Sequence, residues 1–511
     1  MWYHVNHPNP RFFSEYDDNM RRESVKYILN ERYRLRGWYR LPAGLFDNWK
    51  KEAVFPENDA YLLLLKCDGA HEIDPETLSE EEKKMLEGMQ REEIIRPARF
   101  WEMLKPEQMY KQYPARYREE AHWSVTGACN LKCRHCFMSA PHAKHGSPSH
   151  EEIINVADQL AECGVCRVGI TGGEPLIRED FLEIIDAVLE REIGISTIYT
   201  NGWLVDEKLL DEFEKRELRC GVQLSFDGVG MHDFLRGVPG AEERTLNALR
   251  LLQEREYPVS VSMCVHRKNR HTVRETVNLM ASLGVKGIKL GGMMQVGEWA
   301  NPEVLDLQLT PAEEQELFEE YIPQYFEDNA PLSIMMHGSF MYTPGDKHWG
   351  IYNERKCSEE DAKHALACGV LGKNFYIGAD GMVAPCMGMC DCGYASHFPN
   401  LKETPLREIL QESDLVKLCY STVSDVRKGN DECRKCEYID RCTGGCRNAA
   451  LCAGDNFFGV DPDVCEFFRN GWDKRIHDIA QPAFEAYLKR CPPKEKKEES
   501  SGQEQVQEVC P

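Results

Sequence analysis

The stretch HWSVTGACNLKCRHCF, residues 122–137, decides the fold and carries the chemistry that the rest of the chain supports. A short predicted strand leads directly into a loop with Cys129, Cys133 and Cys136, separated by three and two residues. Three thiolates in one tight loop can bind three irons of a cubane cluster and leave the fourth iron open for a cofactor. A zinc ion is the alternative, with His135 as fourth ligand, although His135 lies between two of the cysteines and reaches poorly.

A strand followed by a helix recurs through the middle of the chain. Strands are predicted at residues 122–128, 166–172, 196–202, 221–228, 258–266 and 287–293, with helices at 150–162, 179–192, 207–217, 243–255 and 272–284. Repeated units of this kind build a parallel sheet, either a barrel or part of one. We therefore predict an α/β fold, a partial (β/α)6 barrel, with its functional residues at the carboxyl ends of the strands.

The composition is that of an ordinary globular protein, with 42% hydrophobic and 29% charged residues in 511. A net charge of −23 argues against nucleic-acid or anionic-membrane partners. We find no apolar run long enough to cross a membrane and no secretory signal layout at the N-terminus, so we expect a cytoplasmic protein. Twenty-two cysteines without an export signal point to thiolate ligands of a soft metal or of iron–sulfur clusters.

Four regions are predicted. Residues 1–115 combine short strands with two or three helices, one of them N-capped by Ser79, and suggest a winged-helix-like α+β domain. Residues 116–345 hold the barrel, and residues 346–475 form a cysteine-rich domain in which metal–thiolate bonds would replace part of a core. Residues 476–511 are predicted to be a last helix and a disordered polar tail.

The cysteine-rich region contains a second ordered set of cysteines. Cys368 is followed by Gly381-x4-Cys386, then by Cys433-x2-Cys436-x5-Cys442-x3-Cys446, and finally by Cys465. Taken alone, these spacings are as compatible with two zinc ions as with iron–sulfur clusters.

The C-x3-C-x2-C loop after the first strand resembles the cluster loop of the radical S-adenosylmethionine (SAM) superfamily, whose members have a TIM-like partial barrel. The resemblance implies a 4Fe–4S cluster that binds SAM and cleaves it to a 5′-deoxyadenosyl radical, which abstracts a hydrogen atom from substrate. The second strand ends in TGGEP, which resembles the family's loop for the SAM amino group. Gly172 and Gly173 permit close backbone approach, and Glu174 can accept a hydrogen bond from an ammonium group.

Three further positions match by resemblance. Ser225, in SFDG, is similar to a position that contacts SAM, and Arg236 resembles an arginine that pairs with the SAM carboxylate, a surface arginine being the alternative. His135 occupies the position before the third cysteine, where relatives place an aromatic ring against adenine, and Phe137 is a rival for that role. We could assign no catalytic acid or base from the sequence.

The second cysteine set resembles, in order and spacing, the SPASM extension of radical SAM enzymes. The resemblance implies two auxiliary 4Fe–4S clusters, and thus three clusters in all. One auxiliary cluster would be held by Cys433, Cys436, Cys442 and Cys465. The other would be held by Cys368, Cys386 and Cys446, with Cys357, Cys390, Cys392 or an open site in the fourth position.

Two kinds of SPASM enzyme resemble this chain. Anaerobic sulfatase maturases have an aspartate directly after the Gly-x4-Cys cysteine, where this chain has Met387. Maturases of ribosomally made peptides form thioether or carbon–carbon crosslinks or epimerise residues, and many bind a leader peptide by adding a strand to an N-terminal winged-helix domain. We therefore predict a precursor peptide docked by its leader on residues 1–115, and a reductant such as flavodoxin or ferredoxin. A non-enzymatic electron-transfer or zinc scaffold protein is the alternative, but it would not need TGGEP or SFDG.

Overall fold

The computed structural model describes residues 25–292 and 296–492, and the chain divides into two compact units. The N-terminal unit runs to Gly37 and continues over Leu41–Gln112, whereas the larger unit contains Trp38–Arg40 and everything from Tyr113 onward. The predicted disordered tail, beyond residue 492, and residues 1–24 lie outside the described residues. No helix in the described part of the chain is long and apolar enough to cross a membrane.

Two small sheets and two α-helices make up the described part of the N-terminal unit. In the first sheet, β1 (Val25–Leu29) lies between β5 (Asp68–Ile73) and β6 (Ile95–Pro97), antiparallel to both. The second sheet has the order β4–β3–β2–β7, with β2 at Tyr33–Trp38, β3 at Leu41–Asp47, β4 at Glu52–Val54 and β7 at Lys111–Gln112. The helices are α1 (Asn58–Leu65) and α2 (Glu80–Arg91), and both contribute leucines to the core of this unit.

The start of α2 confirms the predicted N-cap. The Ser79 hydroxyl accepts a hydrogen bond from the Glu82 amide (3.2 Å), and the Glu82 carboxylate accepts one from the Ser79 amide (2.8 Å). This reciprocal capping box satisfies two amides that the first helical turn leaves without partners. The mixture of short strands and helices is that of an α+β unit, and its winged-helix character remains a prediction.

Ten strands form the sheet of the larger unit, in the order β15–β14–β13–β12–β11–β10–β9–β8–β16–β17. All six predicted strands are present and parallel, as β8 (Glu120–Ser124), β9 (Arg167–Thr171), β10 (Gly194–Thr200), β11 (Gly221–Ser225), β12 (Val259–Cys264) and β13 (Gly287–Gly291). Because neighbours in the sheet are also neighbours in the chain, the order is that of a βα barrel and not of a doubly wound sheet. The predicted α/β fold class is therefore confirmed.

The sheet continues beyond the six predicted strands at both ends. After β13 it gains β14 (Ser333–Met336), which is parallel, and β15 (Phe340–Tyr342), which is antiparallel. Beside β8 it gains β16 (Asn374–Ile377), parallel to β8, and β17 (Val383–Ala384), antiparallel to β16. Part of the cysteine-rich region is thus hydrogen-bonded to the first strand of the barrel.

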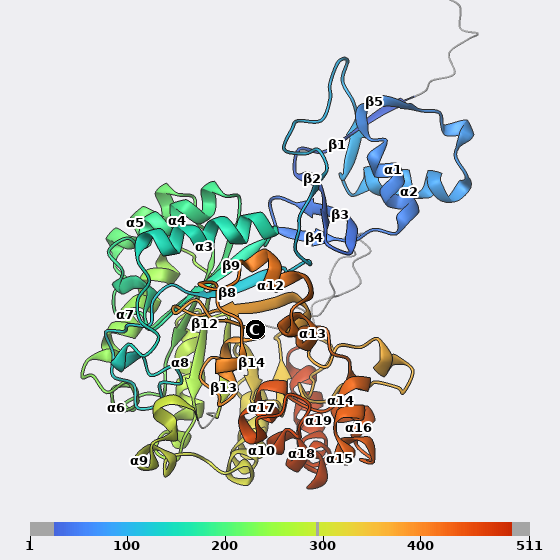
Figure 1. Cartoon of the computed structure of the whole chain (residues 1–511). Helices are drawn as coiled ribbons and strands as arrows, with labels where there is room; N and C mark the ends of the chain where they lie inside the picture. Colours follow the sequence, from blue (N-terminus) through green and yellow to red (C-terminus); the bar gives the residue numbers. More distant parts are fainter. Residues whose placement is uncertain (1–24, 293–295, 493–511) are drawn as a thin grey trace, which may run out of the picture. The chain divides into compact units, whose positions relative to one another are not determined.

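Helices cover one face of this sheet (Figure 1). They are α3 (His150–Cys163), α4 (Phe181–Glu190), α5 (Glu207–Lys215), α6 (His232–Arg236), α7 (Ala241–Glu254), α8 (Val273–Ser282), α9 (Pro302–Leu305) and α10 (Pro311–Glu327). Apart from the short α6 and α9, whose Leu235 and Val304 form a separate cluster with Cys264 and Trp299, these helices share one hydrophobic core with the strands. The predicted helices at 150–162, 179–192, 207–217, 243–255 and 272–284 correspond to α3, α4, α5, α7 and α8.

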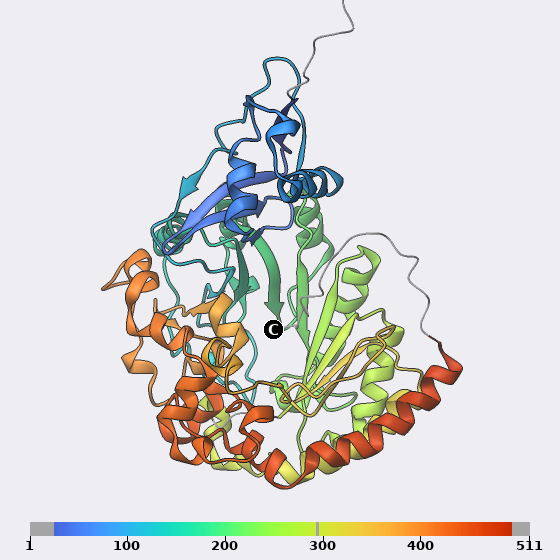
Figure 2. The same cartoon turned by 90° about the vertical axis from the view of Figure 1, so that its right-hand side faces the viewer.

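Short helices fill the C-terminal part of the larger unit. They are α11 (Gly369–Lys373), α12 (Leu406–Glu412), α13 (Asp414–Cys419), α14 (Val423–Gly429), α15 (Asp431–Arg434), α16 (Ile439–Cys442), α17 (Arg447–Gly454) and α18 (Pro462–Arg469). The long helix α19 (Trp472–Arg490) packs along α10 (Figure 2). Phe484 of α19 contacts the rings of Phe326 and Tyr342. This aromatic contact attaches the end of the described chain to the barrel.

Candidate active site

The three-cysteine loop leaves the sheet at the carboxyl end of β8, as predicted, and backbone amides point at its sulfurs. The Leu131 amide donates to Cys129 Sγ (3.4 Å), and the Ala140 amide donates to Cys136 Sγ (3.2 Å). Amide donors stabilise thiolates, and such bonds tune the potential of a cluster that the thiolates hold. Burial raises the pKa of Cys129 to about 12, so without a metal ion this thiol is protonated. Binding of a cluster by Cys129 therefore has to release this proton.

Two separate segments hold the loop from opposite sides through its backbone. On one side, Lys132 and Arg134 donate their amides to carbonyls of α6, those of Arg236 (3.2 Å) and Leu235 (2.9 Å). On the other side, the amide of Glu298 donates to the Cys136 carbonyl (2.8 Å). The spacing of the three sulfurs is thus set by backbone contacts from α6 and from the segment after β13.

The TGGEP segment lies directly against the residues that precede Cys129. The amide of Gly173 donates to the Thr126 carbonyl (2.8 Å), and that of Glu174 donates to the Ala128 carbonyl (2.9 Å). A Cβ added at Gly173 would lie 2.1 Å from the Ala128 oxygen, which no side chain can occupy. Gly172 has a φ of +154°, and a Cβ added there would lie 2.6 Å from the Thr126 oxygen, which is also too close. Glycine at these two positions is therefore required for the loops of β8 and β9 to meet.

Glu174 ties the ends of β9 and β10 together. Its carboxylate accepts hydrogen bonds from the Thr200 hydroxyl (2.7 Å), the Asn201 amide (2.7 Å) and the Leu176 amide (3.1 Å). The side chain is fully buried, and burial raises its pKa to about 7 against the opposing effect of these bonds. The predicted contact with an ammonium group remains a prediction, whereas the joining of two strand ends is observed.

Asn201 is a site residue that the sequence argument did not select. It lies at the end of β10, where its side-chain amide donates to Asn130 Oδ1 (2.8 Å) and lies 3.8 Å from Cys129 Sγ. The one signal in the sequence is the segment YTNG, residues 199–202, at the end of the third predicted strand. The sequence of that strand does not indicate which residue of another loop Asn201 contacts. This contact links the third strand of the barrel to the cysteine loop.

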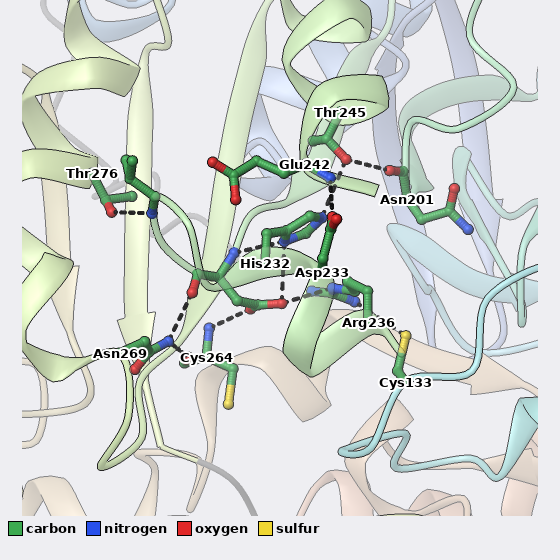
Figure 3. Close-up of polar contacts among 12 residues, drawn as sticks. Cys133, Asn201, His232, Asp233, Arg236, Glu242, Thr245, Cys264, Asn269 and Thr276 are labelled. Atoms are coloured by element: carbon green, nitrogen blue, oxygen red, sulfur yellow. Dashed lines mark hydrogen bonds and ion pairs between the residues drawn. The ribbon is translucent and has the colours of Figure 1, made fainter. Parts of the chain in front are cut away.

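Arg236 is buried, so the alternative that placed it on the surface is wrong. Its Nε lies 2.7 Å from Asp227 Oδ2, and its Nη1 lies 3.7 Å from Cys133 Sγ (Figure 3). Burial by itself would raise the pKa of Asp227, but Arg236 and His232 outweigh it and hold that pKa well below its usual value. Arg236 thus presents a positive charge to the second cysteine of the loop, and Asp227 balances that charge.

Asp227 also organises the surrounding loops through further bonds. Its carboxylate accepts from the Cys264 amide (3.0 Å), its carbonyl accepts from the Asn269 side chain (2.9 Å), and its amide donates to His232 Nδ1 (2.9 Å) (Figure 3). The sequence analysis quoted SFDG but selected only Ser225, because burial of the aspartate is decided by elements distant in sequence. Ser225 ends β11 at the same edge of the sheet, where it is partly buried.

His135 points into the unit and not toward solvent. Its ring is buried and lies edge-on to Trp299, with ring centroids 6.3 Å apart. Burial and the neighbouring Arg236 lower its pKa to about 3, so the imidazole is neutral. A neutral ring is suited to packing, and the predicted contact with adenine remains a prediction.

Four of the cysteines in the second set are assembled around one cavity. Cys433, Cys436, Cys442 and Cys465 line it together with Asp461, Arg469 and apolar residues of α16 and α18. Cys465 follows Cys442 by more than twenty residues, and α18 brings it back to the CxxC pair. A donor set of four thiols around one space fits the cubane that the resemblance implied for these residues.

The other predicted auxiliary cysteines also come together. The thiols of Cys368 and Cys446 both interact with that of Cys386, and with the Tyr352 hydroxyl. Of the predicted fourth ligands, Cys357 packs apart from them with Ala362 and Val423.

Cys390 is buried in the core, and Cys392 contacts Cys452, a cysteine that the sequence analysis did not single out. No group of three or more His, Cys, Asp or Glu side chains in residues 25–292 and 296–492 is arranged to hold a single metal ion. In a cubane each thiolate binds a different iron, so its ligands surround the cluster and do not converge on one point.

A barrel with three cysteines after its first strand, and with two further cysteine groups beside it, defines a class of cluster-dependent enzyme. Residues 123–280 match the family model of the radical SAM superfamily, and residues 368–437 match that of SPASM, an iron–sulfur cluster-binding domain. The chain therefore contains a radical SAM domain followed by a SPASM domain, and it is an enzyme that uses SAM and 4Fe–4S clusters.

Known proteins are similar to this chain in sequence or in fold. An AdoMet-dependent heme synthase of Methanosarcina barkeri is 26% identical over 357 residues, 66% of this chain and 94% of the relative. A PqqA peptide cyclase of Gluconobacter oxydans is 27% identical over 381 residues, 72% of this chain and 96% of the relative. The structure of Streptococcus suis SuiB bound to precursor peptide SuiA matches with a TM-score of 0.59 at 17% identity, over 86% of this chain and all of SuiB.

When bound, the first cluster and SAM together supply a carbon-centred radical that removes a hydrogen atom from substrate. The chain's own residues position the loop that carries the thiols and place a balanced charge at Cys133. The observed donor set, with amides directed at two sulfurs and Arg236 near the third, fits such a cluster.

Replacing Gly173 by Ala should displace the cysteine loop, because the added methyl group collides with the Ala128 carbonyl. We expect SAM cleavage to fall by about 10²-fold and the first cluster to lose iron, as measured by 5′-deoxyadenosine release and iron content. Gly291→Ala is the matched control, since a Cβ there meets nothing within 4 Å. Equal SAM cleavage by the two variants would contradict the close-approach argument.

Replacing Asp227 by Asn should leave Arg236 buried with an unbalanced charge. We expect a loss of about 3–5 kcal/mol in the free energy of unfolding, seen as a lower denaturation midpoint by tryptophan fluorescence. Asp211→Asn is the control, because Asp211 pairs with Arg255 (2.9 Å) while more than half exposed, and such surface pairs contribute about 0–1 kcal/mol. If the denaturation midpoint of Asp227→Asn shifted as little as that of Asp211→Asn, the assignment of Asp227 as the charge that balances Arg236 would be wrong.

Proposed function

We propose that this radical SAM/SPASM enzyme modifies a ribosomally made precursor peptide, by forming a thioether or carbon–carbon crosslink. The observation that carries the proposal is the separate N-terminal unit, which combines a sheet edge with exposed aromatic side chains. The substrate peptide would dock by its leader on this unit and offer its core to the radical.

The extent of the structural match supports this proposal. The larger unit comprises 402 of the 511 residues, about 79% of the chain. The match to SuiB covers 86% of the chain, so it extends into the N-terminal unit. The matches to the heme synthase and to the peptide cyclase cover 66% and 72%. A peptide-bound relative is therefore similar over more of this chain than the curated relatives are.

The edge of the first sheet offers a place for a peptide strand. Among the described residues, β5 is an outer strand of the order β5–β1–β6, and outer strands can pair with an added strand. The segment after β6 lies against the start of β5, where the Leu104 amide donates to the Asp68 carbonyl (3.2 Å). Phe100 and Trp101, in this segment, contact each other and are 88% and 86% exposed. An exposed aromatic pair beside an outer strand suits recognition of an apolar leader residue.

A tetrapyrrole substrate is the second candidate, because the heme synthase of M. barkeri matches the larger part of this chain. A relative named Fe-coproporphyrin III synthase, from the same organism, is 25% identical over 353 residues. This candidate gives no role to the N-terminal unit. A sulfatase-maturase reaction is disfavoured by Met387, and an epimerase reaction would use the same docking site without forming a crosslink.

The test is to incubate the reduced, cluster-loaded enzyme and SAM with the short peptides encoded beside its gene. Formation of one crosslink removes two hydrogen atoms, so we expect a product lighter by that mass, together with 5′-deoxyadenosine. Epimerisation would leave the mass unchanged in water and add deuterium in heavy water. If no peptide changes while tetrapyrrole precursors are converted to Fe-coproporphyrin III or heme, the peptide proposal is wrong.

Two cysteine variants should separate radical formation from product formation. Cys133→Ala should abolish SAM cleavage, because it removes a ligand of the cluster that cleaves SAM. Cys436→Ala should retain SAM cleavage and lose the crosslinked product, because a carbon–carbon or thioether bond formed from a radical releases one electron that needs an acceptor. Normal peptide modification by the Cys436 variant would refute the auxiliary role of that cysteine group.

Replacing both Phe100 and Trp101 by Ser should weaken leader binding by about 2 kcal/mol, roughly 30-fold. Both side chains are mainly exposed, so the fold of the unit should not change. Fluorescence anisotropy of a labelled leader peptide measures the effect, with SAM cleavage unaltered. Trp49→Ser is the matched control, since Trp49 is 75% exposed but belongs to the turn between β3 and β4. Equal leader binding by the double variant and the wild type would exclude this surface.

A further inference from the structure

We infer that Cys452 is the fourth cysteine ligand of the first auxiliary cluster, together with Cys368, Cys386 and Cys446. The inference rests on the cluster-binding class of the enzyme and on those three cysteines, and it does not depend on the substrate being a peptide. Cys452 is absent from the spacing pattern of the second cysteine set, so only the folded chain points to it.

One short helix carries both Cys446 and Cys452. Cys446 is the N-cap of α17, and Cys452 follows six residues later within the same helix. This helix packs against the single turn Met387–Met389, which begins directly after Cys386. The helix with Cys446 and Cys452 is therefore held beside the turn that follows Cys386. The Cys452 thiol interacts electrostatically with the thiols of both Cys386 and Cys446.

Cys368 is the remaining thiol of the group. It interacts electrostatically with Cys386 and Cys446, and Tyr352 interacts with both Cys368 and Cys446. Three separate segments thus contribute four thiols that are coupled to one another through Cys386 and Cys446, and a cubane has four corners to be ligated.

Other cysteines are placed less well for this role. The Cys357 thiol lies 3.7 Å from the Ser358 carbonyl and packs with Ala362 and Val423. Cys390 is 2% exposed, and its charged neighbours are Asp391, Asp380 and Lys144. Cys392 contacts the thiol of Cys452.

The position of Cys452 also indicates the role of the first auxiliary cluster. Cys452 and Cys392 line a cavity with Lys144 and Asp391, and with Ser139 and Gly297, which flank the loop of Cys136. A cluster closed by Cys452 has no free iron for a substrate atom, so it serves as an electron acceptor at the wall of this cavity. The thiols of Cys392 and Cys452 are in hydrogen-bond contact, and hydrogen bonds to ligating sulfurs tune the potential of a cluster.

The test uses the full chain with Cys129, Cys133 and Cys136 all replaced by Ala, so that only the auxiliary clusters remain. In this background, Cys452→Ala should leave one cluster with three ligands. We expect it to lose one iron on mild oxidation and to give the electron paramagnetic resonance signal of a 3Fe–4S cluster, with a matching fall in iron content. Cys392→Ala is the matched control and should keep two intact 4Fe–4S clusters.

A second variant keeps the test decisive if Cys452→Ala binds too little iron to be measured. Cys452→Ser retains an oxygen ligand, and we expect four irons with a shifted midpoint potential and a distinct iron site by Mössbauer spectroscopy. Wild-type spectra and potential for Cys452→Ser, or a 3Fe–4S signal from Cys357→Ala with none from Cys452→Ala, would overturn the assignment. Neither result depends on the substrate of the enzyme.

Discussion

The close backbone contact between the loop after β9 and the residues before Cys129 is the constraint on which the site depends. A catalytic cluster bound by three cysteines needs its ligands held firmly, because the fourth iron must stay open to a cofactor. Here the amides of Gly173 and Glu174 bond to the Thr126 and Ala128 carbonyls, and α6 bonds to the other side of the loop. The loop is thus positioned by backbone hydrogen bonds and is not left to be ordered by metal alone.

The site also has to accommodate buried charge, and the larger unit balances that charge with neighbouring side chains. A cluster with its thiolates is anionic, and Arg236 brings a cation to within 3.7 Å of Cys133 Sγ. That cation is itself compensated by Asp227, which further bonds hold to the segments after β12. Because an unpaired buried charge is costly, the network is expected to lose stability whenever one member is removed.

The auxiliary sites are joined to the barrel by the sheet itself. β16 pairs in parallel with β8, the strand that leads to the three-cysteine loop, and Cys368 and Cys386 lie just before and after the β16–β17 hairpin. The region that composition set apart as a cysteine-rich domain therefore shares a sheet and a core with the barrel. Auxiliary clusters bound on this extension would therefore be held in a fixed position relative to the three-cysteine loop.

The sequence by itself predicted the six parallel strands, because hydrophobic periodicity is a local property of the chain. Its motifs indicated the class of enzyme and the cofactors through their resemblance to a known family. The same resemblance grouped Cys433, Cys436, Cys442 and Cys465, which the fold assembles around one cavity. Only the tertiary structure decided that Arg236 is buried against Asp227, that Asn201 reaches Asn130 and that β16 joins β8. The same holds for Cys452, since contacts between segments distant in the chain leave no mark on the spacing of either segment.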